Sequence, residues 1–235
     1  IIGFVKEQLE NERRCSILPI NVKAYVKLGA TILVESGIGI SVNIDDSDYI
    51  DAGATIETDR ACVLAKADFL MSIHALSKAD LEKTKTTVCC ISFLDPFNAL
   101  EHIKWLQESG RSALSVEMIP RSSRCQKMDA LSSQASLAGY VMVAKAMSTL
   151  PRIFPMMMTP AGTLKPSKVF VIGAGVAGLQ AIATAKRLGA AVIAYDTREV
   201  VAEQVRSLGA KFLAIDIGET GQTDQGYANA LSPEP

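Results

Sequence analysis

A glycine-rich turn in the second half of the sequence has the composition of a phosphate-binding loop. Gly173, Gly175 and Gly178 form the pattern G-x-G-x-x-G between an apolar segment, 169–172, and a helical segment that begins at Val176. In dinucleotide-binding folds the first glycine permits a tight turn, the second lets the backbone approach the pyrophosphate, and the third lets helix and strand pack closely. The helix amino end adds free N–H groups and a positive dipole. The pattern predicts a dinucleotide site; the alternative is a turn that binds no ligand.

An acidic residue follows at the position where a ribose would lie. Asp196 stands 18 residues after Gly178, at the carboxyl end of the next predicted strand, 191–195. A carboxylate there accepts hydrogen bonds from a ribose 2′-hydroxyl and repels a 2′-phosphate. Arg198 is an opposing signal, because an arginine two residues further on could receive that phosphate. We give the carboxylate more weight, since it would stay close to any phosphate, and predict NAD(H) rather than NADP(H).

Four polar side chains gather in a loop near the middle of the sequence, namely Arg121, Gln126, Asp129 and Ser132. The last three are spaced i, i+3, i+6, so they share a face if the following helix starts early. An amide, a carboxylate and a hydroxyl can hold a carboxamide, such as that of nicotinamide, by matching donors and acceptors. The same spacing fits a cluster that caps the helix, with a surface arginine beside it. The residues by themselves leave both interpretations open.

The amino-terminal segment, 1–128, alternates strand-like and helix-like stretches. The expected strands are 1–5, 31–35, 69–73, 86–93 and 113–116, and the expected helices are 19–28, one near 47–52, and one that Asp95 and Pro96 would open and that would run to about 109. Strands separated by helices indicate a parallel sheet covered on both faces. This segment is therefore predicted to be one α/β domain with five strands.

The remainder of the chain is predicted to contain a helix, a connection and a further α/β domain. Residues 129–166 form a helix to about 148 and then a connection with four prolines, which we expect to be stiff. Residues 167–235 alternate strands, 168–172, 191–195 and 211–215, with helices, 176–188 and 199–208. The predicted fold class is therefore α/β with two parallel-sheet three-layer domains. The second is a Rossmann dinucleotide-binding domain of which this chain supplies only the first half.

The composition excludes several other classes of protein. The 235 residues are 49% apolar and 21% charged, with a net charge of −1, which leaves no basic surface for nucleic acid. No apolar run is long enough for a membrane helix, and the amino end lacks the pattern of a signal peptide. Five cysteines and two histidines show no metal-ligand spacing and no disulfide framework. We expect a soluble chain with free thiols and no bound metal.

The block 120–140, PRSSRCQKMDALSSQASLAGY, resembles the nucleotide-site loop and helix in domain I of the proton-translocating nicotinamide nucleotide transhydrogenases. Shorter matches lie at 2–7 (IGFVKE), 11–14 (NERR), 34–37 (VESG) and 196–198 (DTR). The similarity covers nearly the whole chain, and the block 120–140 is its most specific part. The chain thus resembles the alpha subunit, or domain I, of a family that also contains the alanine dehydrogenases.

This resemblance implies a role for each matching residue. Arg121, Gln126 and Asp129, with Ser132 beside them, would hold the nicotinamide ring, and Lys127 and Met128 would complete that loop. The glycine turn with Val176, followed by Asp196, Thr197 and Arg198, would contact the pyrophosphate and the adenosine. Gly226 and Tyr227 resemble a mobile loop whose tyrosine closes over the bound nucleotide.

The resemblance also implies an activity and partners. NAD(H) would bind to this chain and NADP(H) to a partner domain, with direct hydride transfer between them. In the full complex a membrane domain would couple that transfer to proton translocation. The chain would be a homodimer in the peripheral part of a membrane complex, facing the bacterial cytoplasm or the matrix side of a mitochondrion-related organelle.

Several positions depart from the family pattern, and two alternatives stay open. Where alanine dehydrogenases use a lysine and a histidine to bind pyruvate, this chain has Ser72 and Asp95, and only Arg14 remains. Many transhydrogenases also keep that lysine, and the three methionines at 156–158 are atypical. The alternatives are an alanine dehydrogenase-like, NAD-dependent amino-acid dehydrogenase and an NAD-binding module without catalysis.

Overall fold

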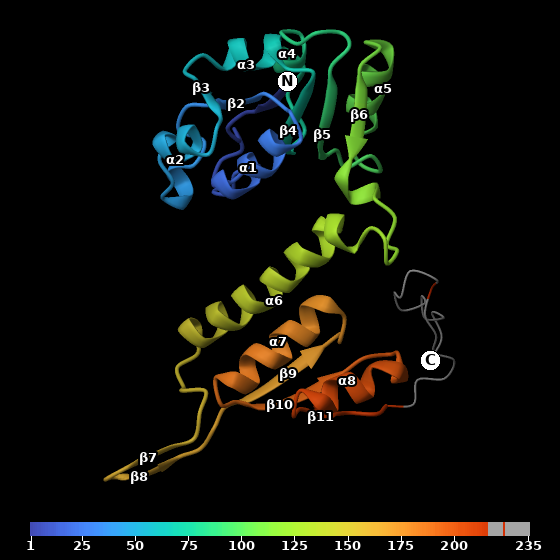
Figure 1. The fold of residues 1–235 in the computed structure, drawn as a ribbon. Helices are drawn as coiled ribbons and strands as arrows, with labels where there is room; N and C mark the ends of the chain where they lie inside the picture. The colour runs from blue at the N-terminus through green and yellow to red at the C-terminus, as the bar shows by residue number, and fades with distance from the viewer. Residues whose placement is uncertain (216–222, 224–235) are drawn as a thin grey trace. The chain divides into compact units, whose positions relative to one another are not determined.

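The computed structural model describes residues 1–215 and residue 223. Contacts between residues divide the chain into two compact units, Ile1–Pro120 and the part from Arg121 onward. The division 1–128, 129–166 and 167–235 expected from the sequence differs, because residues 121–128 and the helix after them group with the second unit. Figure 1 shows the elements of both units, which are described separately below.

The first unit is built on a six-stranded parallel sheet. Its order is β3-β2-β1-β4-β5-β6, the 3-2-1-4-5-6 order of a doubly wound fold. The strands are β1 (Ile2–Phe4), β2 (Ile32–Glu35), β3 (Thr55–Glu57), β4 (Phe69–His74), β5 (Cys89–Phe93) and β6 (Ser112–Ser115). Every neighbouring pair is parallel, so the carboxyl ends of all six strands lie at one edge. The α/β fold with a parallel sheet is confirmed for this unit.

Helices cover both faces of this sheet, because successive apolar side chains along its strands point alternately to one face and to the other. Phe4, Ile32 and Val34 pack with Val22 of α1 (Pro19–Lys27) and Tyr49 of α2 (Asp46–Asp51). On the other face, Val5, which follows β1, and apolar residues of β2, β4 and β5 pack against α3 (Arg60–Lys66), α4 (Lys78–Leu81) and α5 (Leu100–Glu108). The residues Phe4 and Val5, adjacent in the chain, belong to opposite clusters, as the period of a strand requires.

Two details of the first unit differ from the sequence-based prediction. The sheet has six strands, not five, because the three-residue strand β3 is too short and too exposed to show an apolar pattern. The helix expected to open at Asp95 begins only at Leu100. Asp95 has a φ of 49°, and the carboxylate of Glu117 accepts the backbone N–H groups of Leu94 and Asp95. These bonds hold residues 94–99 as a turn, so the prediction of a helix start there was wrong.

The second unit stacks two helices on a parallel sheet. Its strands β9 (Lys168–Ile172), β10 (Ala191–Tyr195) and β11 (Lys211–Phe212) lie in the order β11-β10-β9, the first half of the same doubly wound order. Helix α7 (Val176–Arg187) packs on β9 and β10, and α8 (Ala202–Ser207) follows the short turn η4 (Glu199–Val201). The long helix α6 (Ala130–Thr149) lies along α7 (Figure 1). The Rossmann-like arrangement is confirmed for these elements.

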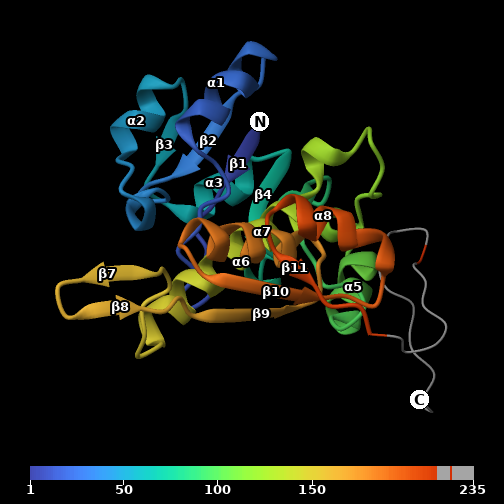
Figure 2. The ribbon, with the colours of Figure 1, turned by 90° about the horizontal axis from the view of Figure 1, so that it is seen from below.

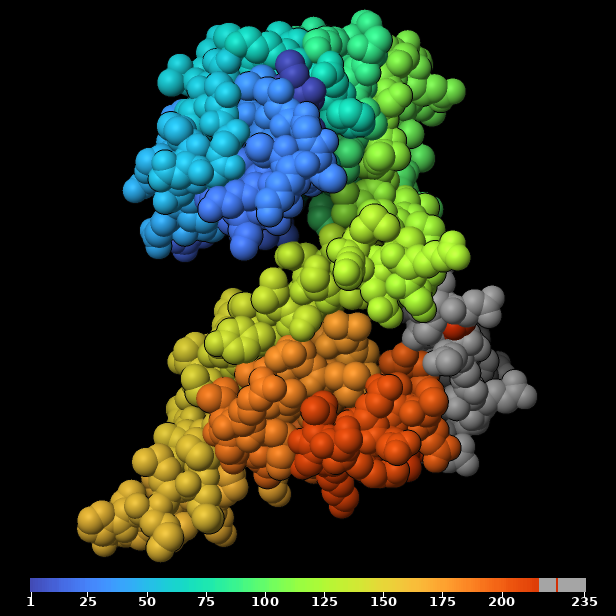
Figure 3. Space-filling view, viewed as in Figure 1, coloured from blue at the N-terminus to red at the C-terminus, as the bar shows by residue number. Residues whose placement is uncertain are grey.

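The proline-rich stretch after α6 contains a small antiparallel sheet where the sequence predicted only a connection. Strands β7 (Met157–Thr159) and β8 (Gly162–Leu164) pair from Met157 to Leu164 and from Thr159 to Gly162. The hairpin stands out from the second unit (Figures 2 and 3). Met158 is 82% exposed. Met157 and Met158 therefore lie in an exposed strand, Met156 precedes it, and none of the three belongs to a core.

A buried ion-pair network ties helices α3 and α4 to strand β2. The guanidinium of Arg60 donates to Asp80 Oδ2 from Nη2 at 2.8 Å and to Glu35 Oε2 from Nη1 at 2.8 Å. All three side chains are less than one-fifth exposed. Burial alone would lower the pKa of Arg60, and its bonds to Asp80 and Glu35 raise it above the ordinary value.

Replacing Arg60 with alanine should therefore leave two buried carboxylates without their shared cation. We expect Arg60→Ala to lower the free energy of unfolding by about 3 kcal/mol. Lys66→Ala changes a residue of the same helix and breaks its exposed pair with Glu57, so it should cost much less. Urea unfolding of both variants measures the difference. Equal losses would show that the Arg60 network contributes no more than a surface pair.

Candidate functional site

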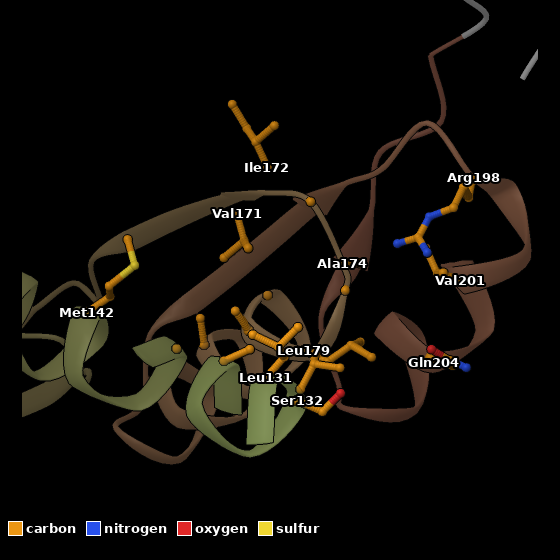
Figure 4. A pocket seen from close by; sticks show the side chains of 18 of the residues that line it. Leu131, Ser132, Met142, Val171, Ile172, Ala174, Leu179, Arg198, Val201 and Gln204 are labelled. Atoms are coloured by element: carbon orange, nitrogen blue, oxygen red, sulfur yellow. The ribbon is translucent and has the colours of Figure 1, made fainter. Parts of the chain in front are cut away.

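A pocket of about 940 Å³ lies within the second unit. Five segments line it: Arg121 in the loop before α6, the face of α6 that carries Ser132 and Met142, the end of β9, the glycine turn 173–178 with the start of α7, and residues of the 198–204 segment. Figure 4 shows Ser132 and Leu179 on one side of Ala174, and Arg198, Val201 and Gln204 on the other. The pocket therefore joins the glycine turn and the polar loop that the sequence singled out.

Each glycine of the turn meets a different steric requirement. Gly173 has a φ of 93° and donates its N–H to Tyr195 O at 2.8 Å, which fixes the turn to strand β10. A Cβ on Gly178 would lie 1.7 Å from Gly173 O, so no larger residue fits there. A Cβ on Gly175 would have only the Arg198 guanidinium nearby, at 4.0 Å, so the backbone at Gly175 faces open space at the N-terminus of α7. This geometry suits a phosphate bound by backbone N–H groups.

The carboxylate of Asp196 lies beneath the turn and is largely enclosed. Its Oδ2 accepts the N–H of Ala174 at 2.7 Å and Nη2 of Arg198 at 2.9 Å, and its Oδ1 accepts the N–H and Nε of Arg198 at 2.8 and 2.9 Å. A carboxylate has about four acceptor positions, so these bonds occupy most of its capacity. A ribose hydroxyl would therefore have to replace one of the donors of Arg198.

The protonation of Asp196 follows from opposing effects. Burial alone would raise the pKa of this carboxyl, but the hydrogen bonds from Arg198 and from the Ala174 N–H lower it below its ordinary value. The pKa of Arg198 is in turn raised, chiefly by its hydrogen bond to Asp196. The two side chains form an ion pair that is 5% exposed at Asp196 and 13% at Arg198. Both groups stay charged at neutral pH.

A second polar network lies at the amino end of α6. Asp129 is the N-cap, and its Oδ1 accepts the backbone N–H of Ser132 at 2.9 Å. Ser132 Oγ donates to Asp129 Oδ2 at 2.7 Å and accepts from Nη2 of Arg121 at 3.0 Å. The hydrogen bonds from Ser132, first that of its backbone N–H, lower the pKa of Asp129, and the charge of Arg121 adds to the effect. The cluster therefore caps the helix, as one interpretation of the spacing predicts, and its binding of a carboxamide stays a prediction.

The other residues singled out from the sequence lie differently. Gln126, Lys127 and Met128 form the short turn η3 (Gln126–Met128) and are exposed. They are not among the described residues that line the pocket. Thr197 is half-buried between Asp196 and Arg198. Gly226 and Tyr227 lie outside the described residues.

Two contributions to the site were not identified from the sequence. One is the backbone N–H of Ala174, which binds Asp196 and carries no side-chain signal. The other is Gly139, which lines the pocket and packs against the backbone of Ala177. A signal for Gly139 did exist, because it lies seven residues after Ser132 and hence on the same face of the helix.

The first unit contains a polar cluster around Arg14. The guanidinium donates to both oxygens of Glu12, from Nε at 2.8 Å and from Nη2 at 2.5 Å, and these bonds hold the pKa of Glu12 far below its usual range. His74 Nε2 lies 2.9 Å from the same carboxylate. Of the two residues that replace the lysine and histidine of the alanine dehydrogenases, Ser72 donates its Oγ to His74 O, and Asp95 accepts from Asn98 Nδ2. The charge of Arg14 is thus matched by a carboxylate of its own chain.

Within the described part of the chain, no three His, Cys, Asp or Glu side chains group as a metal site requires. Nor do residues 1–215 include a helix that is both long and apolar enough to cross a membrane.

Comparison with known proteins extends over both units. The family described as Alanine dehydrogenase/PNT, N-terminal domain, matches residues 3–138, and the corresponding C-terminal domain matches 142–230. An NAD(P) transhydrogenase subunit alpha protein of Rhodospirillum rubrum is 41% identical over 242 residues, which cover 99% of this chain and 62% of the relative. The equivalent protein of Rickettsia prowazekii is 38% identical, with the same coverage.

Solved structures agree with these sequence matches. A transhydrogenase crystal structure from Sinorhizobium meliloti has a TM-score of 0.88 and 42% identity, over 92% of this chain and 62% of that one. An L-alanine dehydrogenase structure at 24% identity and a TM-score of 0.76 shares the fold. The chain spans about three-fifths of the length of these transhydrogenase relatives. The resemblance carried by the block 120–140 is confirmed, and the chain belongs to the alanine dehydrogenase/PNT family.

Proposed function

We propose that this chain is the NAD(H)-binding component of a transhydrogenase, in which hydride passes directly between NADH here and NADP+ on a partner domain. The observation that carries the proposal is one pocket lined both by the glycine turn and by Arg121 and Ser132. A pocket that binds a dinucleotide needs two such groups of residues, one for the pyrophosphate and one for the nicotinamide. The relatives named as transhydrogenase alpha subunits support the same assignment.

The residues of the pocket match a dinucleotide in their chemistry. The amino end of α7 and the open backbone at Gly175 can accept phosphates without a Cβ in the way. At the other end, Arg121 can donate to a carboxamide oxygen, while the Asp129 carboxylate can accept from the carboxamide NH₂. Apolar lining residues such as Leu131 and Met142 can exclude water from the ring.

The role of these side chains is orientation. Bound NADH supplies the hydride itself. Because hydride moves from carbon to carbon, no side chain has to give or take a proton. Arg121, Ser132 and Asp129 are joined by hydrogen bonds, so each restricts the rotamers of the others and the ring they hold. Fixing the two reacting groups near contact distance is the main way such a site accelerates the reaction. In this proposal Gln126, Lys127 and Met128 approach the ring from the exposed turn η3.

Asp196 would select NAD(H) over NADP(H). Its ionised carboxylate lies at the carboxyl end of β10, where the adenosine ribose lies in dinucleotide folds. A ribose hydroxyl would take the place of one N–H of Arg198, which would then turn toward the pyrophosphate. A 2′-phosphate would meet the carboxylate at close range and be repelled. Val176, Thr197, Gly226 and Tyr227 would complete the nucleotide contacts.

The partners in this proposal are an NADP(H)-binding domain and a membrane domain, with a second copy of this chain as a homodimer partner. The chain would be a peripheral part of that membrane complex and carry no proton itself. An alanine dehydrogenase activity is less well supported, because Arg14 is already paired with Glu12 and the family lysine is replaced by Ser72. The NAD-binding module without catalysis differs from our proposal only in the absence of hydride transfer.

Hydride transfer tests the proposed role of the polar network. The protein is mixed with a separately purified NADP(H)-binding domain of a relative, and NADH-dependent reduction of a spectroscopically distinct NADP analogue is followed. We expect Arg121→Ala and Asp129→Asn to slow transfer by about 100-fold, because the ring loses its fixed orientation. NADH affinity should fall much less. Ser133→Ala, which changes an exposed hydroxyl of the same helix, is the matched control.

Normal transfer rates in both variants would remove Arg121 and Asp129 from the proposed site. Complete absence of transfer in the unaltered protein, together with tight NADH binding, would favour the module without catalysis. Oxidation of NADH by pyruvate and ammonia would instead support the amino-acid dehydrogenase.

Ligand selection tests Asp196. Asp196→Asn keeps the size of the side chain and removes its charge, so we expect weaker NADH binding, by about tenfold, and a smaller preference over NADPH. Titration of nucleotide fluorescence gives both dissociation constants. Glu203→Gln removes an exposed charge on α8 and should leave both unchanged. An unaltered preference in Asp196→Asn would contradict the ribose assignment.

The lowered pKa of Asp196 also predicts how stability depends on pH. Its contribution is fully present above the ordinary aspartate value, about 4, and is lost as pH falls through the lower pKa of the folded state. We expect Asp196→Asn to destabilise the second unit by about 3 kcal/mol at pH 7, since Arg198 loses its buried partner. The difference from the unaltered protein should shrink below about pH 4. Thermal unfolding across this range measures it, and a constant difference would refute the linkage.

A further inference from the structure

Helices α6 and α7 approach each other backbone to backbone at Gly139. This residue is buried, and a Cβ built on it would lie 2.2 Å from Ala177 O, 3.0 Å from Ala177 C and 3.2 Å from Ala177 Cα. Real carbon atoms do not approach a carbonyl oxygen so closely, and a backbone oxygen cannot rotate away as the end of a flexible side chain can. Any residue other than glycine at 139 therefore requires one helix to move.

The helix that has to move is α6. Helix α7 is held by the sheet, because Gly178 packs onto Gly173 and Gly173 in turn bonds to Tyr195 O. Its apolar residues Ile182 and Ala185 are fully buried in the core of the unit. Helix α6 lies outside α7 and joins that core through Val143 (Figure 1). A side chain at 139 would thus displace α6 while the glycine turn keeps its place.

Such a displacement would reach the polar network. Ser132 lies seven residues before Gly139, about 10 Å along the helix and on the same face. Both residues line the pocket, and so does Ala135 between them. Ser132 in turn bonds to Asp129 and Arg121. The depth at which α6 packs at Gly139 therefore sets the distance between this network and the turn that binds pyrophosphate.

We propose that Gly139 is a positioning residue that sets the spacing between the nicotinamide end and the pyrophosphate end of the site. The inference rests on the function proposed above and deepens it. Gly139 acts through the position of the helix backbone, not through a side chain of its own. Its effect passes through Ser132, whose position relative to the glycine turn must match the length of the dinucleotide.

The test separates the two ends of the ligand. ADP-ribose contains the adenosine, the pyrophosphate and the second ribose but no nicotinamide, so it reports on the glycine turn, whereas NADH requires both ends. For Gly139→Ala in the full chain, we expect ADP-ribose affinity within about twofold of the unaltered protein. The affinity for NADH should fall to about that for ADP-ribose, and the rate of hydride transfer should fall by at least about tenfold.

Val143→Ala is the control for simple destabilisation. It removes packing at the same helix interface without adding an atom, so it should lower the melting temperature and leave the ratio of the two affinities unchanged. If Gly139→Ala does not fold, Ser136→Val offers a milder change. It replaces the hydroxyl, which lies 3.5 Å from Gln180 Oε1, with a methyl group and adds a second methyl group one turn earlier in the helix, so it should reduce the same ratio of affinities.

The outcomes distinguish this inference from the proposed function. If the unaltered protein neither prefers NADH to ADP-ribose nor transfers hydride, the proposed function fails and this inference fails with it. If the unaltered protein does both, and Gly139→Ala weakens the two ligands equally or not at all, the proposed function stands and the positioning role is overturned. The positioning role would also be overturned if Val143→Ala changed the ratio of NADH affinity to ADP-ribose affinity as much as Gly139→Ala does.

Discussion

The carboxylate of Asp196 joins the glycine turn to the end of strand β10 and to the segment that follows this strand. Asp196 directly follows strand β10, and its carboxylate accepts the N–H of Ala174 in the glycine turn and pairs with Arg198. Because the carboxylate is almost fully enclosed, removal of any one donor leaves charge that water cannot reach. The turn, the strand end and the segment leading to α8 are therefore held by one anion. The open backbone at Gly175 depends on the turn beneath it being fixed in this way.

The polar network at Asp129 depends on the same turn through a different contact. Helix α6 carries the network at its amino end and approaches the turn by way of α7, where Gly139 packs on Ala177. At Gly139 no side chain separates the two helices, so the distance there is set by backbone atoms, which cannot change rotamer. A site built on two such helices keeps its dimensions better than one built on loops. The exposed turn η3, with Gln126, lacks this support.

The sequence predicted the features of this arrangement whose causes are local. The glycine turn, the N-cap at Asp129 and the strands with β-branched runs follow from neighbouring residues, and the structure has them where expected. Strand β3, which the sequence did not predict, and the turn at Asp95, where it predicted the start of a helix, have non-local causes. Strand β3 forms because β2 offers it a partner, and the turn at Asp95 forms because Glu117, 22 residues later, binds its backbone. The contact of Gly139 with Ala177 is non-local as well, since a glycine within a helix shows no sign of its packing partner.

The balance of charge in the pocket bears on the direction of the proposed reaction. Oxidised and reduced nicotinamide differ by one positive charge on the ring. An unpaired arginine or aspartate beside the ring would favour one redox state strongly, because electrostatic effects grow in an enclosed site. Arg121 and Asp129 lie 3.5 Å apart at their nearest charged atoms and contribute little net charge together. Arg198 is likewise matched by Asp196. Binding would then rest on backbone N–H groups and shape, which are the same for both forms. This balance suits a component that accepts NADH and releases NAD+, or the reverse, because an unmatched charge beside the ring would favour one of the two forms.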